Sequence, residues 1–178
     1  MKVGIPSEIF PNELRVAATP KTVKRLQKQG FELYIQHNAG VKANFSDKEF
    51  EEALQLDPDN DNVLNNYAYY LALRKQNLSK AEKLSKRSIE LSPNNVSYMD
   101  TFGWILFQQE KYSEAKIYFE KALDKGGFNR PAIVEHLGDV FYKLNQPDKA
   151  LENWNKSKEL GNTSDLLKKK IADKKYYE

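Results

Sequence analysis

From about residue 61 onward the chain repeats itself, and this repetition constrains the fold more than any other feature of the sequence. Three segments, LNNYAYYLA, MDTFGWILF and VEHLGDVFY, align on a small residue at a spacing of 35: Ala68, Gly103 and Gly138. A second small residue recurs in the following segments at a spacing of 34 or 35: Ala81, Ala115 and Ala150. Periods of this length are typical of arrays in which one supersecondary unit stacks on the next. The repeating part is therefore predicted to share one continuous core.

Each repeating unit is predicted to be a pair of short helices. Apolar positions keep one register in all three segments, and proline and glycine are sparse between residues 47 and 125. One such pair is too short to bury an apolar face alone, so neighbouring pairs must share it. The small residues let the two helices of a pair approach closely, and large side chains such as Phe119 and Trp154 fill the space between them. The predicted fold class is mostly α, an α-solenoid.

The period and the positions of the small and aromatic residues resemble the tetratricopeptide repeat family. This resemblance implies a half-repeat, three helix–turn–helix repeats and a cap, at residues 47–60, 61–95, 96–130, 131–164 and 165–178 of a domain spanning 47–178. In the cap we expect Leu166, Leu167 and Ile171 to cover the last repeat while the lysines face water. Three departures from the family pattern fall in the first repeat, and one of them is Ser88 in place of alanine. Ser85 replaces a large apolar residue, and the turn before Lys80 has one extra residue.

Residues 1–46 follow a different pattern, because glycine and proline are frequent there. KVGIP at 2–6 and FELYIQ at 31–36 are predicted to be strands, joined by a helix that ends at Gly30, which makes a small βαβ appendage with parallel strands. The phrases GIPSE and NELRVAATP, and NAG followed by FSD, resemble the start of the alanine dehydrogenase and NAD(P) transhydrogenase α-subunit family. The resemblance implies that Arg15 corresponds to an arginine that helps hold the substrate carboxylate in dehydrogenase members.

We find no catalytic, metal or cofactor motif in the sequence. Its eight glycines nowhere form the G-x-G-x-x-G loop that cradles a dinucleotide pyrophosphate. The two histidines, His37 and His136, are far apart, and there is no cysteine. We therefore predict that the protein is not an enzyme and takes no cofactor or metal. The alternative is a truncated remnant of an NAD(P) transhydrogenase α subunit or alanine dehydrogenase, an NAD(P)-linked oxidoreductase fragment without a complete active site.

Charge and hydropathy argue against nucleic acid and membrane partners. Residues 47–178 hold 21 basic and 22 acidic side chains, so the repeats carry no basic footprint for nucleic acid. No apolar run is long enough to span a membrane. Pro6 and Glu8 interrupt the apolar run that a signal peptide would need. We expect a cytoplasmic protein.

The first helix of each repeat is expected to line a concave face, as in the family that the repeats resemble. The residues that the repeat register directs to this face are aromatic, amide or acidic, with one alanine: Asn62, Asn65, Tyr69, Ala72, Asp100, Trp104, Phe107, Glu135, Asp139 and Tyr142. Such a face suits an extended or helical peptide that is neutral or basic. We predict a non-catalytic protein–protein interaction scaffold that binds a peptide there. A homodimer through the open strand edges of residues 1–46 is a further alternative.

Overall fold

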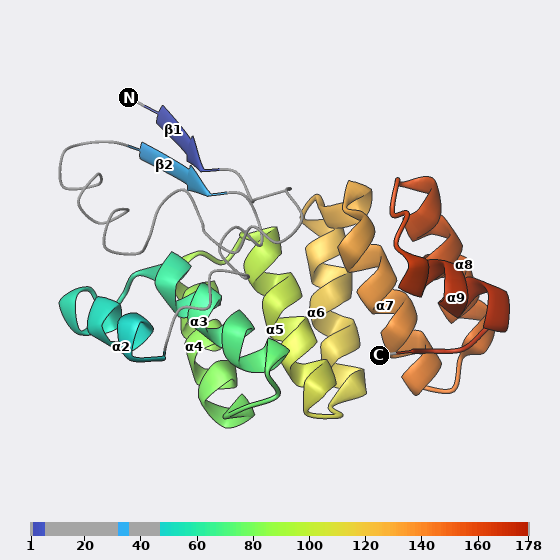
Figure 1. Ribbon diagram of the computed structural model, residues 1–178, viewed down its shortest axis with the longest axis horizontal. Helices are drawn as coiled ribbons and strands as arrows, with labels where there is room; N and C mark the ends of the chain where they lie inside the picture. The colour runs from blue at the N-terminus through green and yellow to red at the C-terminus, as the bar shows by residue number, and fades with distance from the viewer. Residues whose placement is uncertain (1, 6–31, 36–46, 178) are drawn as a thin grey trace.

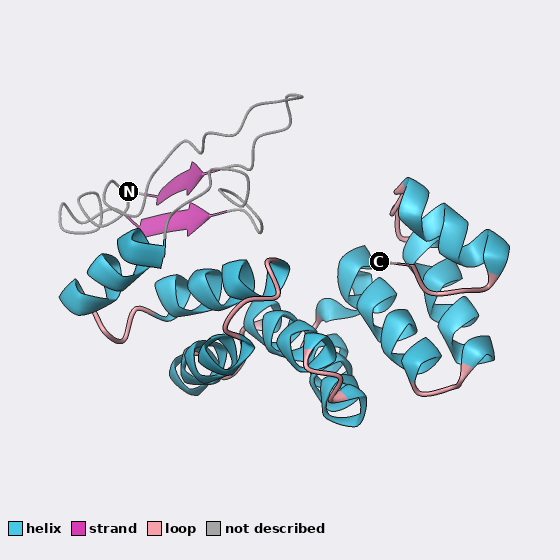
Figure 2. Ribbon diagram, turned by 60° about the horizontal axis from the view of Figure 1, so that its bottom comes forward, coloured by secondary structure: helices cyan, strands magenta, loops and turns pink. Residues whose placement is uncertain are grey.

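A computed structural model describes residues 2–5, 32–35 and 47–177 (Figure 1). Beyond residue 46 its described residues form eight α-helices and one 3-10 helix, stacked in chain order (Figures 1 and 2). The elements are α2 (Asp47–Leu56), α3 (Asp61–Leu73), α4 (Leu78–Leu91), α5 (Val96–Gln108), α6 (Tyr112–Asp124), η2 (Gly127–Asn129), α7 (Pro131–Lys143), α8 (Pro147–Glu159) and α9 (Asp165–Asp173). The helical repeat fold predicted from the 35-residue period is confirmed for this part of the chain.

The stack consists of three helix pairs: α3 with α4, α5 with α6 and α7 with α8. Each pair also contacts the next one. Local sequence explains where the helices begin. The side chain of Asn60 accepts a hydrogen bond from the backbone N–H of Val63 at the start of α3, and Asn95 does the same for Ser97 in α5. At the start of α7, Pro131 takes the first-turn position where its fixed φ suits a helix.

The turn between the two helices of each pair contains a left-handed residue at the same position in all three repeats. Lys75, Glu110 and Asn145 all adopt positive φ, at 51°, 62° and 58°, and they are spaced 35 residues apart. The first turn contains a second left-handed residue, Asn77 at φ 47°, directly before α4. This is the extra residue expected from the sequence, and the turn absorbs it without shifting the helix register.

The small residues of the first helices lie against the large residues of the second helices, as predicted. A Cβ atom added to Gly103 would come within 2.9 Å of the Phe119 ring, and one added to Gly138 within 2.6 Å of the Trp154 ring. The first repeat solves the same packing problem differently. There Ala68, which has a Cβ of its own, stands where the other repeats have glycine, and Ser85 stands where they have Phe119 and Trp154; both residues are fully buried.

The half-repeat α2 is held to the first repeat by aromatic packing and by polar contacts. Phe50 is buried and its ring stacks on Tyr67 with the centroids 4.9 Å apart. The Tyr67 hydroxyl donates to Glu51, and the Lys80 ammonium reaches both of these groups. Residues 47–56 therefore act as the second helix of an incomplete repeat and cover one end of the stack.

The cap α9 covers the other end, but not in the way expected. Leu167 is fully buried, whereas Leu166, which was expected to cover the last repeat, is 40% exposed. The expectation that the lysines face water is wrong for Lys170, which is only 2% exposed, because two carboxylates of α7 compensate its charge. Lys168 and Lys169 are exposed as expected.

The N-terminal strands β1 (Lys2–Ile5) and β2 (Glu32–Ile35) pair in parallel, with Lys2 opposite Glu32 and Ile5 opposite Ile35. The helix expected between them, and Arg15 and His37, lie outside the described residues, so the complete βαβ unit stays a prediction. Over residues 2–5, 32–35 and 47–177, no helix is long and apolar enough to cross a membrane.

Candidate functional site on the first helices

The helices α3, α5 and α7 form a continuous surface, because α3 contacts α5 and α5 contacts α7. We call this surface the first-helix face. All ten residues predicted for peptide binding lie on these three helices. Five of them are half-buried, with part of each side chain reaching solvent: Asn62, Tyr69, Trp104, Glu135 and Tyr142. The other five are buried: Asn65, Ala72, Asp100, Phe107 and Asp139. The buried five are covered by other residues of the chain in this arrangement, so the part of the predicted site that reaches solvent is smaller than expected.

An aromatic row crosses the boundary between the second and third repeats. The Trp104 ring stacks on Phe107 with centroids 5.2 Å apart and on the imidazole of His136 at 4.7 Å. His136 Nδ1 lies 2.8 Å from Asp100 Oδ1. Burial favours the neutral imidazole, but Asp100, with help from Asp139 and Glu135, outweighs it and raises the pKa of His136. The row is therefore fixed from both sides, by stacking and by a polar contact across the repeat boundary.

Tyr69 occupies the position in the first repeat that Trp104 occupies in the second, since each directly follows the small residue of its helix. Its burial, together with the charge of Asp100, raises the pKa of Tyr69 to about 12. The equivalent position in the third repeat holds Asp139. The first-helix face thus presents aromatic rings from the first two repeats, and Tyr142 supplies one from the third, a helical turn farther along α7.

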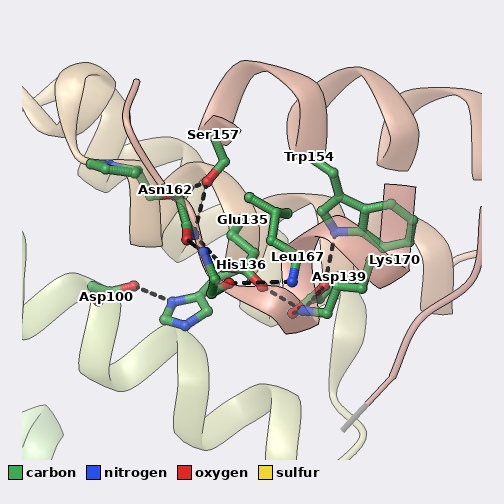
Figure 3. Close-up of polar contacts among 11 residues, drawn as sticks. Asp100, Glu135, His136, Asp139, Trp154, Ser157, Asn162, Leu167 and Lys170 are labelled. Carbon is green, nitrogen blue, oxygen red and sulfur yellow. Dashed lines mark hydrogen bonds and ion pairs between the residues drawn. The ribbon is translucent and has the colours of Figure 1, made fainter. Parts of the chain in front are cut away.

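A buried polar cluster lies where the cap meets the third repeat (Figure 3). The Lys170 ammonium donates to Asp139 Oδ1 and Oδ2 at 2.8 Å and to Glu135 Oε1 at 2.7 Å. The indole N–H of Trp154 donates to Asp139 at 2.9 Å, and Asn162 donates to Glu135 at 2.7 Å. Burial raises the pKa of Asp139 to about 6, although Lys170 favours its ionised form. Sequence reasoning placed Glu135 and Asp139 at a ligand, whereas here they hold the cap.

Two contributors to this region were missed at the sequence level. Lys170 lies on the apolar stripe of α9, between Leu167 and Ile171, and a lysine at such a position is a signal for a buried partner. Tyr176 lies beyond the last helix, where no repeat pattern applies. Its ring contacts Phe107 and Tyr142 on the first-helix face, with centroids 5.7 and 6.5 Å apart. Among the described residues, no cluster of His, Asp or Glu has the arrangement of a metal site.

The fold and the first-helix face define a tetratricopeptide-repeat domain. The "Tetratricopeptide repeat" family model matches residues 96–124. The structure of pilF from Pseudomonas aeruginosa is similar, with a TM-score of 0.59 and 27% identity over 71% of this chain and 59% of that chain. The structure of YrrB, titled "a TPR protein with an unusual peptide-binding site", has a TM-score of 0.60 and 26% identity over 70% of this chain and 63% of that one. Such repeats are typical of protein-binding scaffolds.

The family model "Alanine dehydrogenase/PNT, N-terminal domain" matches residues 4–93, half of the chain, and the chain belongs to that family. NAD(P) transhydrogenase subunit alpha of Haemophilus influenzae is 53% identical over 53 residues, which are 30% of this chain and 10% of that protein. Type IV pilus assembly protein PilF of Pseudomonas aeruginosa is 31% identical over 112 residues, which are 62% of this chain and 44% of PilF. The chain thus spans less than half the length of these relatives. Within the matched span, residues 47–93 hold α2, α3 and α4 of the helical stack.

Proposed function

We propose that this chain is a non-catalytic scaffold that binds a peptide segment of a partner protein along its first-helix face. One observation carries the proposal: Tyr69, Trp104 and Tyr142, one ring from each of the three first helices, are all half-buried and partly open to solvent. Large aromatic side chains held rigidly by their neighbours make strong anchors, because they lose little conformational freedom on binding. A row of them over three stacked helices suits a peptide that runs across the stack.

The acidic residues of the face do not themselves argue for a basic ligand. Asp100 pairs with His136, Glu135 with Lys170 and Asn162, and Asp139 with Lys170 and Trp154. A carboxylate that already has a partner offers little to a cation from outside, because the new contact must replace the old one. We therefore base the proposed recognition on ring contacts and shape. Whether the bound peptide is neutral or basic is a question for the binding measurements.

The test is selection of binders from a library of random linear peptides against the immobilised full chain. Selected peptides are then measured by fluorescence polarisation against wild type and against Trp104→Ala. Truncating a central aromatic anchor is expected to weaken binding by about thirtyfold, equal to about 2 kcal/mol. The matched control is Ile117→Ala, which removes an exposed side chain from the second helix α6 and is expected to leave the affinity unchanged. Affinities that survive Trp104→Ala, or that fall with Ile117→Ala, would contradict the proposed binding face.

For the N-terminal segment we propose a βαβ unit without its own catalysis. The parallel pairing of β1 with β2 supports the unit, and the family match supports its origin in a dehydrogenase-type domain. The rival is a remnant of a transhydrogenase or alanine dehydrogenase that still binds its cofactor. Titration of the full chain with NADH and NADPH, followed by cofactor fluorescence, separates the two. We expect no saturable binding; a micromolar dissociation constant would overturn the non-catalytic proposal.

A further inference from the structure

The C-terminal residues return to the first-helix face instead of continuing away from the stack. Helix α9 ends at Asp173, and Lys174 then takes a left-handed conformation with φ 50°. The backbone N–H of Lys175 donates to the carbonyl of Lys170 at 3.1 Å, which closes the turn. In Figure 1 the chain runs from α9 back across α7 and ends beside it. The turn thus directs the last described residues toward α5 and α7.

Tyr176 makes the contacts that an aromatic ligand would make there. Its ring meets Phe107 of α5 edge-on, at 5.7 Å and 62°, and Tyr142 of α7 at 6.5 Å and 33°. The Lys143 ammonium lies 4.7 Å from the centre of the Tyr176 ring, within the range of a cation–π contact. Phe107 and Tyr142 were both predicted as ligand contacts, and both touch the chain's own tail.

The neighbouring Tyr177 provides a natural comparison. Its hydroxyl donates to Asp173 at 2.7 Å, and the Lys169 and Lys175 ammonium groups lie 4.2 and 5.8 Å from its ring centre. These partners all belong to α9 and the tail itself. The two adjacent tyrosines therefore differ in one respect that can be tested, since the ring of Tyr176 contacts two rings of the first-helix face, Phe107 and Tyr142.

We propose that residues 174–177 are an internal ligand of the first-helix face, and that Tyr176 occupies the place of an aromatic side chain of the partner peptide. The inference rests on the proposed function and adds a ligand class and a form of regulation to it. The partner presents an exposed aromatic residue, which enters between Phe107 and Tyr142 and receives Lys143 over its ring. Partner and tail compete for this place. Ring contacts at a surface are individually weak, so a partner that makes further contacts displaces the tail reversibly.

The size of the competition follows from the short connection between α9 and the tail. A segment tethered by a few residues acts as if it were present at about 1 mM. If the tail sequence itself binds the vacated place with a dissociation constant of about 100 µM, the tail fills that place about nine-tenths of the time, and a competing free peptide binds the wild-type chain about tenfold more weakly than it binds the vacated place. Removing the Tyr176 ring should free this place and restore the tighter binding of the free peptide.

The probe is a fluorescently labelled peptide with the chain's own sequence ADKKYYE, residues 172–178, titrated into four full-length proteins. These are wild type, Tyr176→Ala, Tyr176→Phe and the matched control Tyr177→Ala. We expect Tyr176→Ala to bind the probe about tenfold more tightly than wild type does, with Tyr176→Phe and Tyr177→Ala close to wild type. Far-UV circular dichroism of each protein checks that the helices persist.

Several results would overturn the proposal. Equal affinity of wild type and Tyr176→Ala would show that the tail does not compete. An equal gain from Tyr177→Ala would show that the effect belongs to the tail in general and not to the ring in the first-helix face. Loss of helical signal in Tyr176→Ala would make the ring part of the core instead of a ligand.

The library selection keeps this inference separate from the proposed function. If selected peptides depend on Trp104 but bind wild type and Tyr176→Ala equally, the scaffold proposal stands and the internal ligand is refuted. If no selected peptide depends on Trp104 for binding, the proposed function is refuted, and with it the inference that rests on it. Enrichment of aromatic residues among the selected peptides, together with tighter binding to Tyr176→Ala, supports both.

Discussion

Gly138→Ala tests the packing rule that organises the whole stack. A Cβ atom there would lie 2.6 Å from Trp154 Cδ1, 2.7 Å from Trp154 Nε1 and 3.1 Å from the carbonyl oxygen of Ala150. The indole is fully buried, and its N–H donates to Asp139 at 2.9 Å. The ring therefore has to move to admit a methyl group, and its movement strains that hydrogen bond. At Gly103 the obstacle is the Phe119 ring alone, at 2.9 to 3.1 Å, and no hydrogen bond restrains that ring.

The expected cost follows from these contacts. Overpacking costs about 1–3 kcal/mol and loss of a hydrogen bond to a charged group about 1.5–3, while alanine gains about 1 over glycine in a helix. We expect Gly138→Ala to lower the free energy of unfolding by about 2–4 kcal/mol and Gly103→Ala by no more than about 2. Urea denaturation followed by far-UV circular dichroism measures both. A Gly138→Ala protein as stable as wild type, or one less affected than Gly103→Ala, would refute the close-packing argument.

Three further predictions concern polar groups and one strained turn. Lys170→Met leaves the buried Asp139 and the half-buried Glu135 without their cation and should cost about 3–5 kcal/mol of stability in urea, whereas Lys168→Met, which removes an exposed ion pair, should leave the stability nearly unchanged. The raised pKa values of Asp139, about 6, and of His136 mean that the native state holds these protons more tightly than the unfolded chain does. Stability should therefore fall as pH rises from about 4 to 6 and continue to fall above about 6.5, and in His136→Gln only the upper part of that fall should disappear. Glu110→Gly removes a side chain from a left-handed turn position. It should raise the free energy of unfolding by about 0.5–1 kcal/mol, and the thermal midpoint should rise with it. An unchanged or lower midpoint would show that this turn carries no strain.

The parts of the fold that could be predicted from the sequence are those where the packing admits only one type of residue at a position. Gly103 faces Phe119 and Gly138 faces Trp154 because two helices approach too closely for a Cβ atom. That demand recurs with every repeat, so it is visible as a period. The left-handed turn residues recur with the same period, but their conformation could not be predicted, because Lys75 and Glu110 are not residues that favour positive φ.

The candidate site was harder to predict, because the repeat register places a residue on a helix face without saying how deeply it is covered. Trp104 and Phe107 belong to one helix face and stack on each other, but Trp104 stays half-buried while Phe107 is only 4% exposed. Phe107 also meets Tyr112 at the start of α6 and Tyr176 from the tail. Neither contact follows from the register of α5, because one depends on the turn and the other on residues beyond the last repeat.

The cap shows most clearly why periodicity alone is insufficient. The spacing of Leu167 and Ile171 correctly predicts which side of α9 meets the stack, and a lysine between them looks like an interruption of that side. Lys170 is nevertheless buried, because Asp139 stands in the third repeat where the earlier repeats carry Tyr69 and Trp104. A charge at the end of the aromatic row is compensated by an opposite charge in the cap. The last repeat is therefore specialised for termination, and the residues that terminate it are those that, by their register alone, were expected to bind a ligand.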